Sequence, residues 1–191
     1  MQSFSNPKTR GYFATRHEKD LTKERKFWET QPVLKAREMI KGQIKVEKGP
    51  LERKKKEDVR QEPYNVPEGF EWSEIDLNDE KDLEELYKLL HDHYVEDDDG
   101  YFRFDYAKEF LQWALMPPNY DPELAFCIRA SKSKKMVAFI SGIFINIKVE
   151  DKEIRATEVN FLCVYKKLRN KYVAPLLIKE VTRRSNLKGV W

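Results

Sequence analysis

Three apolar, β-branched runs in the second half of the chain constrain its fold most strongly. They are AFCIRA at 125–130, MVAFISGIFINIKV at 136–149 and EIRATEVNFLCV at 153–164, and polar turn residues separate them. Runs of this composition bounded by turn signals are typical of strands. The pattern therefore predicts an antiparallel meander.

Helices are predicted both before and after this meander along the chain. Asp79 or Asn78 can cap a helix with acidic residues early in it, as the helix dipole prefers, and with a leucine stripe that predicts one buried face. The stripe consists of Leu83, Leu86, Leu89 and Leu90. A second helix is predicted over 106–115, with Trp113 in the core, and Pro117 and Pro118 end it. The predicted fold class is α+β.

The last predicted strand delivers the chain into a basic loop where a third helix begins. Lys166, Lys167, Arg169 and Lys171 precede a helix predicted over about 173–184, with Gly189 as its stop. Backbone N–H groups at a helix N-terminus and the helix dipole favour an anion, and Pro175 fits the first turn. The alternative is a solvated basic turn.

Composition limits the classes of function. With 191 residues, 40% of them apolar, the chain can form a core for one domain. A net charge of +3 does not indicate a general polyanion surface, so no nucleic-acid specificity is expected. There is no apolar run of about 18 residues and no secretory signal near Met1, which predicts no transmembrane segment. Cys127 and Cys163 are expected to be buried thiols, typical of a cytoplasmic protein.

The chain before the predicted domain is polar and charged. We expect a flexible arm at 1–25 containing the start of a short helix at 21–26, and an extended segment and charged linker at 26–75. Phe27 and Trp28 need a partner surface there, and QEPYNVPEGFEW at 61–72 predicts an extended segment laid on a folded body. Regular structure is expected after Asp76, in a domain at 76–191. Because VW after Gly189 resembles the start of another strand, we expect a fragment of a longer protein.

The acidic run VEDDDG at 95–100 and the three histidines are candidate ligands. Clustered carboxylates attract hard cations, but this run lacks the alternating spacing of a calcium loop, so no metal site is predicted. A solvated acidic loop is the alternative. His91 and His93 are two residues apart, which places them on different faces of a helix, and they and His17 are assigned no role.

Several motifs, in one order from about Lys26 to the last residue, resemble eukaryotic N-myristoyltransferases, which join myristate to an N-terminal glycine. EVNFLCVYKKLRNKYVAP followed by LLIKEVTRR carries the closest resemblance. KFWETQPV, RQEPY, VPEGF, YVEDDDGYFRFDY, EFLQWAL and FIS add to it. The resemblance implies a GNAT-like acyl-CoA N-acyltransferase fold, the first of two tandem units, with the C-terminal half of the enzyme outside this sequence.

The resemblance also implies site residues. The backbone N–H groups of Phe161 and Leu162 would form an oxyanion hole for the thioester carbonyl. The base would be the C-terminal carboxylate of the missing half, and direct addition and elimination would need no nucleophilic side chain. Myristoyl-CoA would be a co-substrate, with no tightly bound cofactor. Its implied binding residues are Lys26, Phe27, Trp28, Asn160, Phe161, Leu162, Cys163, Val164, Arg169, Asn170, Lys171, Tyr172, Val173, Ala174 and Pro175.

The acceptor would be a peptide with an N-terminal glycine. Tyr94, Phe102 and Phe104 would form its walls, and Val95 and Asp97 would line its approach, where acidic groups suit a downstream lysine. The basic residues at 53–56 suggest ribosome or anionic-lipid association, with simple solvation as the alternative.

The loop departs from the family at two positions. Asn170 stands where serine is common, and Tyr172 stands where an arginine is common, which removes one phosphate-binding charge. The wider GNAT pattern would fall on Arg169, Tyr172 and Ala174, but its first glycine is absent. Two other functions stay open: a GNAT N-acetyltransferase, and a non-catalytic acyl-CoA-binding fragment. A pocket for fourteen carbons would distinguish a myristoyltransferase from the acetyltransferase, and turnover by the chain alone would rule out the non-catalytic fragment.

Overall fold

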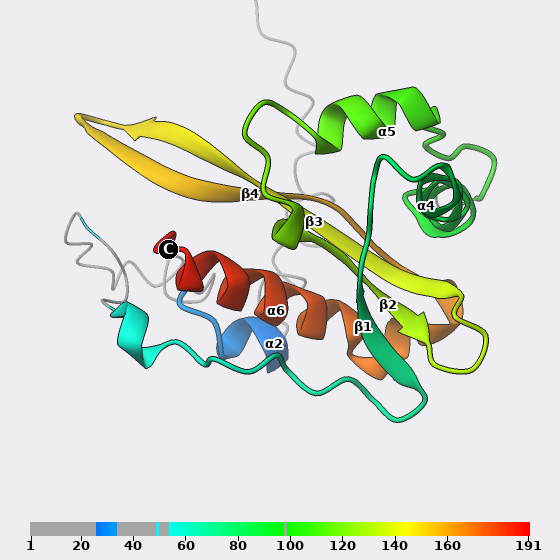
Figure 1. The fold of residues 1–191 in the computed structure, drawn as a ribbon, viewed down its shortest axis with the longest axis horizontal. Coiled ribbons are helices and arrows are strands. Elements are labelled where there is room, and N and C mark those ends of the chain that lie inside the picture. Colours follow the sequence, from blue (N-terminus) through cyan, green and yellow to red (C-terminus); the bar gives the residue numbers. More distant parts are fainter. Residues whose placement is uncertain (1–25, 34–48, 50–53, 98) are drawn as a thin grey trace, which may run out of the picture. The chain divides into compact units, whose positions relative to one another are not determined.

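The computed structural model describes residues 26–33, 49, 54–97 and 99–191 (Figure 1). Contacts divide the chain into two units, 1–54 and 55–191. In the first, α2 (Lys26–Glu29) brings the rings of Phe27 and Trp28 edge to face, with centroids 5.0 Å apart. The arm expected at 1–25, the helix start at 21–25, His17, and most of the linker at 35–53 lie outside the described residues.

In the second unit, the described strands form one antiparallel sheet in the order β1-β2-β3-β4. The strands are β1 (Phe70–Glu74), β2 (Ala125–Ala130), β3 (Met136–Val149) and β4 (Lys152–Val164). The predicted meander of β2, β3 and β4 is confirmed. β1 was missed, because its residues follow Pro67 and Gly69 and were assigned to an extended segment. It pairs with β2 from Phe70↔Ala130 to Glu74↔Phe126.

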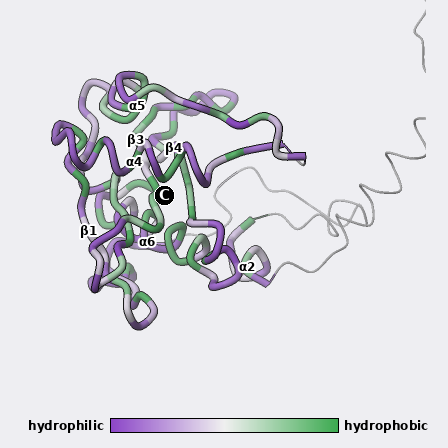
Figure 2. Tube along the Cα trace, turned by 90° about the vertical axis from the view of Figure 1, so that its right-hand side faces the viewer, coloured by the Kyte–Doolittle hydropathy of each residue, from purple (hydrophilic) through white to green (hydrophobic). Residues whose placement is uncertain are grey.

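Helices cover both faces of the sheet. α6 (Val173–Leu187) packs on one face, and α4 (Glu80–His93) and α5 (Lys108–Leu115) pack on the other (Figure 1). Successive strand residues alternate between these layers: Phe126 and Ile128 pack with Leu177 of α6, whereas Cys127 packs with Leu86 of α4. The β3–β4 hairpin extends away from the helices, and its tip is hydrophilic (Figure 2).

The predicted helix ends agree closely with the structure. Asp79, one of the two expected caps, accepts a hydrogen bond from the Asp82 N–H at 3.0 Å, and the leucine stripe of α4 is buried. α5 starts at Lys108, two residues later than expected. α6 ends at Leu187, three residues later than expected, and Gly189 with φ 77° is its stop. The N–H of Val190 then donates to the Ser185 carbonyl at 3.1 Å, as in a Schellman motif.

Trp113 is not a core residue. Its side chain is 72% exposed, whereas Leu111 and Leu115 are buried. Residues four apart share a helix face, and a residue midway between them points to the opposite side. The sequence interpretation placed Trp113 in the core because its side chain is aromatic. It did not take into account that Trp113 lies on the helix face opposite Leu111 and Leu115. Both cysteines are free and buried, as predicted.

A buried charged cluster holds the segment before β1 against α6. The fully buried Glu180 carboxylate accepts hydrogen bonds from Arg183 Nη2 at 2.6 Å, Arg184 Nε at 3.1 Å and the Tyr64 N–H at 3.2 Å. Arg183 Nη1 also donates to the Gln61 carbonyl at 2.8 Å. These contacts confirm an extended segment laid on the folded body. Regular structure nevertheless begins before Asp76, with β1 and the 3-10 helix η1 (Lys56–Asp58).

None of the helices within the described ranges is long and apolar enough to cross a membrane.

We predict that Glu180→Gln lowers the free energy of unfolding by about 3–5 kcal/mol, since it leaves Arg183 buried without a countercharge. Burial alone raises the pKa of Glu180, but hydrogen bonds from Arg183, Arg184 and Tyr64 outweigh it and hold the pKa below its ordinary value of 4.5. The stabilisation is therefore fully present above about pH 4.5 and is lost as the pH falls through the lowered pKa.

Urea unfolding of wild type and of Glu180→Gln between pH 3 and pH 7 measures the difference in their free energies of unfolding. Glu84→Gln is the control, because Glu84 forms ion pairs with Lys88 and Lys108 at the surface, where such pairs contribute little to stability. A difference between wild type and Glu180→Gln that did not shrink at low pH would contradict the electrostatic origin.

Candidate functional site

A β-bulge in β4 interrupts its pairing with β3. Cys163 pairs with Phe139 and Asn160 pairs with Ser141, so Phe161 and Leu162 together oppose Ile140. Such an extra residue leaves the regular ladder locally unpaired. Phe161 adopts a left-handed conformation with φ 54°, which is unfavourable for a bulky side chain. The residues predicted to form an oxyanion hole are the two residues of this bulge.

Two neighbouring side chains fix the bulge. The buried Ser141 hydroxyl donates to the Asn160 carbonyl at 2.9 Å. The Phe161 N–H donates to Oδ1 of Asn160 at 2.8 Å, so its acceptor is a side-chain oxygen. The Phe161 ring is 5% exposed and packs against Tyr94 and Tyr106, at centroid distances of 5.9 and 5.4 Å. This packing stabilises the strained backbone conformation.

Beyond the bulge, the 3-10 helix η3 (Lys166–Lys171) carries the basic loop to α6. Tyr172 is the residue before α6; it is left-handed with φ 58°, is 66% exposed, and its side chain does not cap the helix. The uncapped first turn gives this end of α6 a positive potential. Arg169 Nη2 donates to the carbonyl of His93, the last residue of α4, at 2.6 Å.

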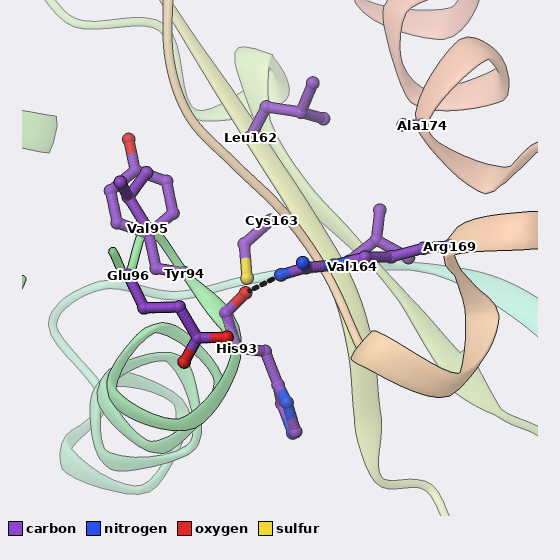
Figure 3. A pocket seen from close by; sticks show the side chains of 9 residues that line it. All are labelled: His93, Tyr94, Val95, Glu96, Leu162, Cys163, Val164, Arg169 and Ala174. Atoms are coloured by element: carbon purple, nitrogen blue, oxygen red, sulfur yellow. Dashed lines mark hydrogen bonds between the residues drawn. The ribbon is translucent and has the colours of Figure 1, made fainter. Parts of the chain in front are cut away.

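A cavity of about 340 Å³ lies between these elements (Figure 3). It brings together seven of the predicted site residues, two from the acceptor group and five from the acyl-CoA group. They are Tyr94, Val95, Leu162, Cys163, Val164, Arg169 and Ala174. His93 and Glu96 also line it, although no role was assigned to either from the sequence.

The other predicted residues do not line this cavity. Asn160 and Phe161 belong to the bulge, Asn170 and Lys171 to η3, and Tyr172, Val173 and Pro175 to the start of α6. Lys26, Phe27 and Trp28 lie in α2 of the first unit. Asp97, Phe102 and Phe104 lie in the loop after α4, where Asp97 Oδ1 accepts the Phe102 N–H at 2.8 Å.

The pKa values of two side chains that line the cavity are shifted by their surroundings. Burial lowers the pKa of His93, and the cations Lys166, Lys135 and Arg169 lower it further against the effect of Asp92. His93 is therefore neutral at pH 7. The hydrogen bond from Lys166 lowers the pKa of Glu96, which keeps its carboxylate ionised. Nδ1 of His93 is buried without a hydrogen-bond partner in the described part of the chain.

Three or more His, Cys, Asp or Glu side chains placed to hold a metal ion do not occur among the described residues. The arrangement combines backbone N–H groups at a bulge, an apolar cavity wall, and a helix N-terminus beside basic side chains. The N–H groups can donate hydrogen bonds to an oxyanion, and the helix N-terminus favours an anion.

Comparison with known proteins gives consistent matches. Residues 50–191 match the family described as myristoyl-CoA:protein N-myristoyltransferase, N-terminal domain. Glycylpeptide N-tetradecanoyltransferase of Dictyostelium discoideum is 53% identical over 169 residues, covering 88% of this chain and 40% of the relative. Glycylpeptide N-tetradecanoyltransferase 1 of Arabidopsis thaliana is 49% identical, covering 88% and 39%. The chain thus spans about 40% of the length of these curated relatives.

Comparison of the fold with solved structures points to the same family. A crystal structure of Saccharomyces cerevisiae N-myristoyltransferase with bound myristoyl-CoA aligns with a TM-score of 0.80 and 43% identity, covering 88% of this chain and 39% of that one. A second structure of that enzyme, with bound myristoyl-CoA and inhibitors, aligns with a TM-score of 0.81 and 42% identity.

We predict that neither thiol reacts in the folded protein. Burial raises the pKa of Cys163 to about 12 and that of Cys127 to about 11, so almost no thiolate is present at pH 8. Ellman's reagent should react with no cysteine in the native chain and with two after guanidinium denaturation. Rapid labelling in the native chain that Cys163→Ala abolishes and Cys127→Ala leaves unchanged would contradict the buried placement of Cys163.

Proposed function

The chain belongs to the myristoyl-CoA:protein N-myristoyltransferase family, and from this premise we propose that it is the acyl-CoA-binding part of an enzyme that transfers myristate to the N-terminal glycine of proteins. Because the chain spans about 40% of its curated relatives, the activity, substrates and partners of the whole enzyme are part of the proposal. The reaction would be an addition of the glycine amine to the thioester, followed by loss of CoA.

The bulge in β4 is the observation that carries this function. An oxyanion hole needs backbone N–H groups that are free of the ladder and fixed before the reaction. The Phe161 N–H is already outside the ladder, with Asn160 Oδ1 as its acceptor. The thioester oxygen would replace that side-chain oxygen, and the Leu162 N–H would be the second donor. The Asn160 side chain would have to turn away, but the two N–H groups would stay where the backbone holds them and would stabilise the charge that develops on the oxygen during the addition.

The start of α6 would hold the phosphates of CoA. Its first turn lacks a side-chain cap, and Arg169 and Lys171 lie in the loop before it. Arg169 is held by its hydrogen bond to the His93 carbonyl. This combination of fixed N–H groups and nearby cations suits a pyrophosphate. The cavity, lined by Leu162, Cys163, Val164 and Ala174, would lie along the path from the phosphates to the thioester. Phe27 and Trp28, in the segment at 26–75, would cover the bound acyl-CoA.

The acceptor glycine would approach from the side of the loop after α4, past Tyr94, Val95 and Asp97, with Phe102 and Phe104 as walls. No side chain is needed as a nucleophile. A second GNAT-like unit, outside this sequence, would supply the base and complete the peptide site. We propose cytoplasmic location, in keeping with two free buried thiols, and ribosome association through the basic residues at 53–56.

Two alternatives differ from this function, one in its ligand and the other in its chemistry. A GNAT N-acetyltransferase would use the same helix N-terminus but would gain nothing from a long acyl chain. A non-catalytic acyl-CoA-binding module would hold myristoyl-CoA and never transfer the acyl group.

We predict that this chain binds acyl-CoA in the order myristoyl, dodecanoyl, decanoyl, acetyl. Each buried methylene contributes about 0.8 kcal/mol, so the loss of two should weaken binding by roughly fifteenfold if the chain is fully buried. Isothermal titration with the four thioesters tests the order, and mass spectrometry afterwards should find no acyl adduct on Cys163. Equal affinity for acetyl-CoA and myristoyl-CoA would favour the acetyltransferase.

We further predict that Tyr172→Arg tightens CoA binding by up to about fivefold, because an exposed cation beside the phosphates contributes up to roughly 1 kcal/mol. The gain should diminish as salt is raised from 50 mM to 500 mM. Tyr172→Gln is the matched control, since it removes the ring without adding a charge. The same affinity for the Arg and Gln variants at low salt would argue against a phosphate at this position.

A further inference from the structure

One ion pair joins two segments of the cavity wall that are far apart in the sequence. Nζ of Lys166, at the start of η3, lies 2.7 Å from each carboxylate oxygen of Glu96, in the loop after α4. The two side chains are 37% and 28% exposed. Neither residue belongs to the acyl-CoA or acceptor residues assigned from the sequence.

Glu96 is part of a small hairpin, so its position fixes more than its own side chain. Glu96 and Arg103 form an isolated antiparallel bridge. The Phe104 N–H donates to the Val95 carbonyl and the Asp97 N–H donates to the Phe102 carbonyl, both at 3.0 Å. The hairpin from Val95 to Phe104 carries four of the five residues proposed to contact the acceptor peptide.

A second contact fastens η3 to the helix that precedes this hairpin. Arg169 donates to the His93 carbonyl across the cavity wall (Figure 3). Arg103, in the hairpin itself, donates from Nη1 to the His91 carbonyl at 3.2 Å, and its Nη2 lies 3.8 Å from the Glu96 carboxylate. Cations at a helix C-terminus satisfy its last carbonyls and its negative potential. Arg169 and Arg103 therefore hold the end of α4. The hairpin beyond it contacts η3 through the ion pair of Glu96 with Lys166.

We propose that Glu96 is a positioning residue, whose ion pair with Lys166 transmits ordering of the acyl-CoA loop η3 to the acceptor hairpin at Val95 to Phe104. This inference rests on the proposed function, in which acyl-CoA binds at η3 and the start of α6. A ligand that orders η3 holds Lys166 in place, and Lys166 then holds Glu96. The hairpin is ordered before the peptide arrives, so the peptide binds at a lower entropic cost.

Hydrogen exchange of the full chain, with and without a non-hydrolysable thioether analogue of myristoyl-CoA at saturation, tests this proposal. In wild type, the analogue should slow exchange of the Asp97 and Phe104 amides by at least about fivefold, the low end of typical coupling between sites. In Glu96→Gln and in Lys166→Gln the slowing should vanish. Lys166→Arg, which keeps the positive charge opposite Glu96, should retain most of it.

Glu71→Gln is the matched control, because it removes an ion pair with Lys134 at the β1 edge and should leave the ligand-dependent slowing intact. A merely structural role for Glu96 would speed exchange equally with and without the analogue, and Lys166→Arg would lose the ligand-dependent slowing as Lys166→Gln does.

The outcomes separate this inference from the proposed function. Binding of the analogue to wild type without any slowing at Asp97 and Phe104 would overturn the role of Glu96 and leave the proposed function standing. Slowing that persists in Glu96→Gln would do the same. Failure of wild type to bind the analogue would overturn both.

Discussion

The extra residue of β4 is the constraint on which the rest of the site depends. Before it, β4 pairs with β3 through Asn160↔Ser141; after it, pairing resumes at Cys163↔Phe139. The bulge turns the Phe161 N–H out of the ladder and directs the Phe161 ring between Tyr94 and Tyr106. It also sets which face each later residue occupies, so that Cys163 faces α4 while Val164 faces α6.

The cavity lies where two helix ends of opposite polarity meet. The C-terminus of α4 is the negative end, and Arg169 and Arg103 donate to its last carbonyls. The N-terminus of α6 is the positive end, and the side chain of Tyr172 does not cap it. Because the negative end is satisfied by the protein itself, the positive end is the one that favours a ligand from solution, and that ligand would be an anion.

Local patterns predicted the elements but not the features that require tertiary contacts. Asp79, the leucine stripe of α4 and the stop at Gly189 follow from helix chemistry within a few residues. β1 depends on pairing with β2, some 55 residues further along the chain, and no local signal predicted it. The left-handed Phe161 and the pair of Glu96 with Lys166 also depend on distant partners. Trp113 was an error of helical phase that Leu111 and Leu115 could have corrected. The resemblance located the bulge residues, but not their geometry.

The most direct test of the account is native mass spectrometry of this chain with myristoyl-CoA and acetyl-CoA offered together in equal amounts. The account predicts a complex with myristoyl-CoA, non-covalent and lost on denaturation, because in the proposed function the start of α6 binds the CoA phosphates and a long acyl chain buries additional apolar surface. Retention of acetyl-CoA in preference to myristoyl-CoA would contradict it.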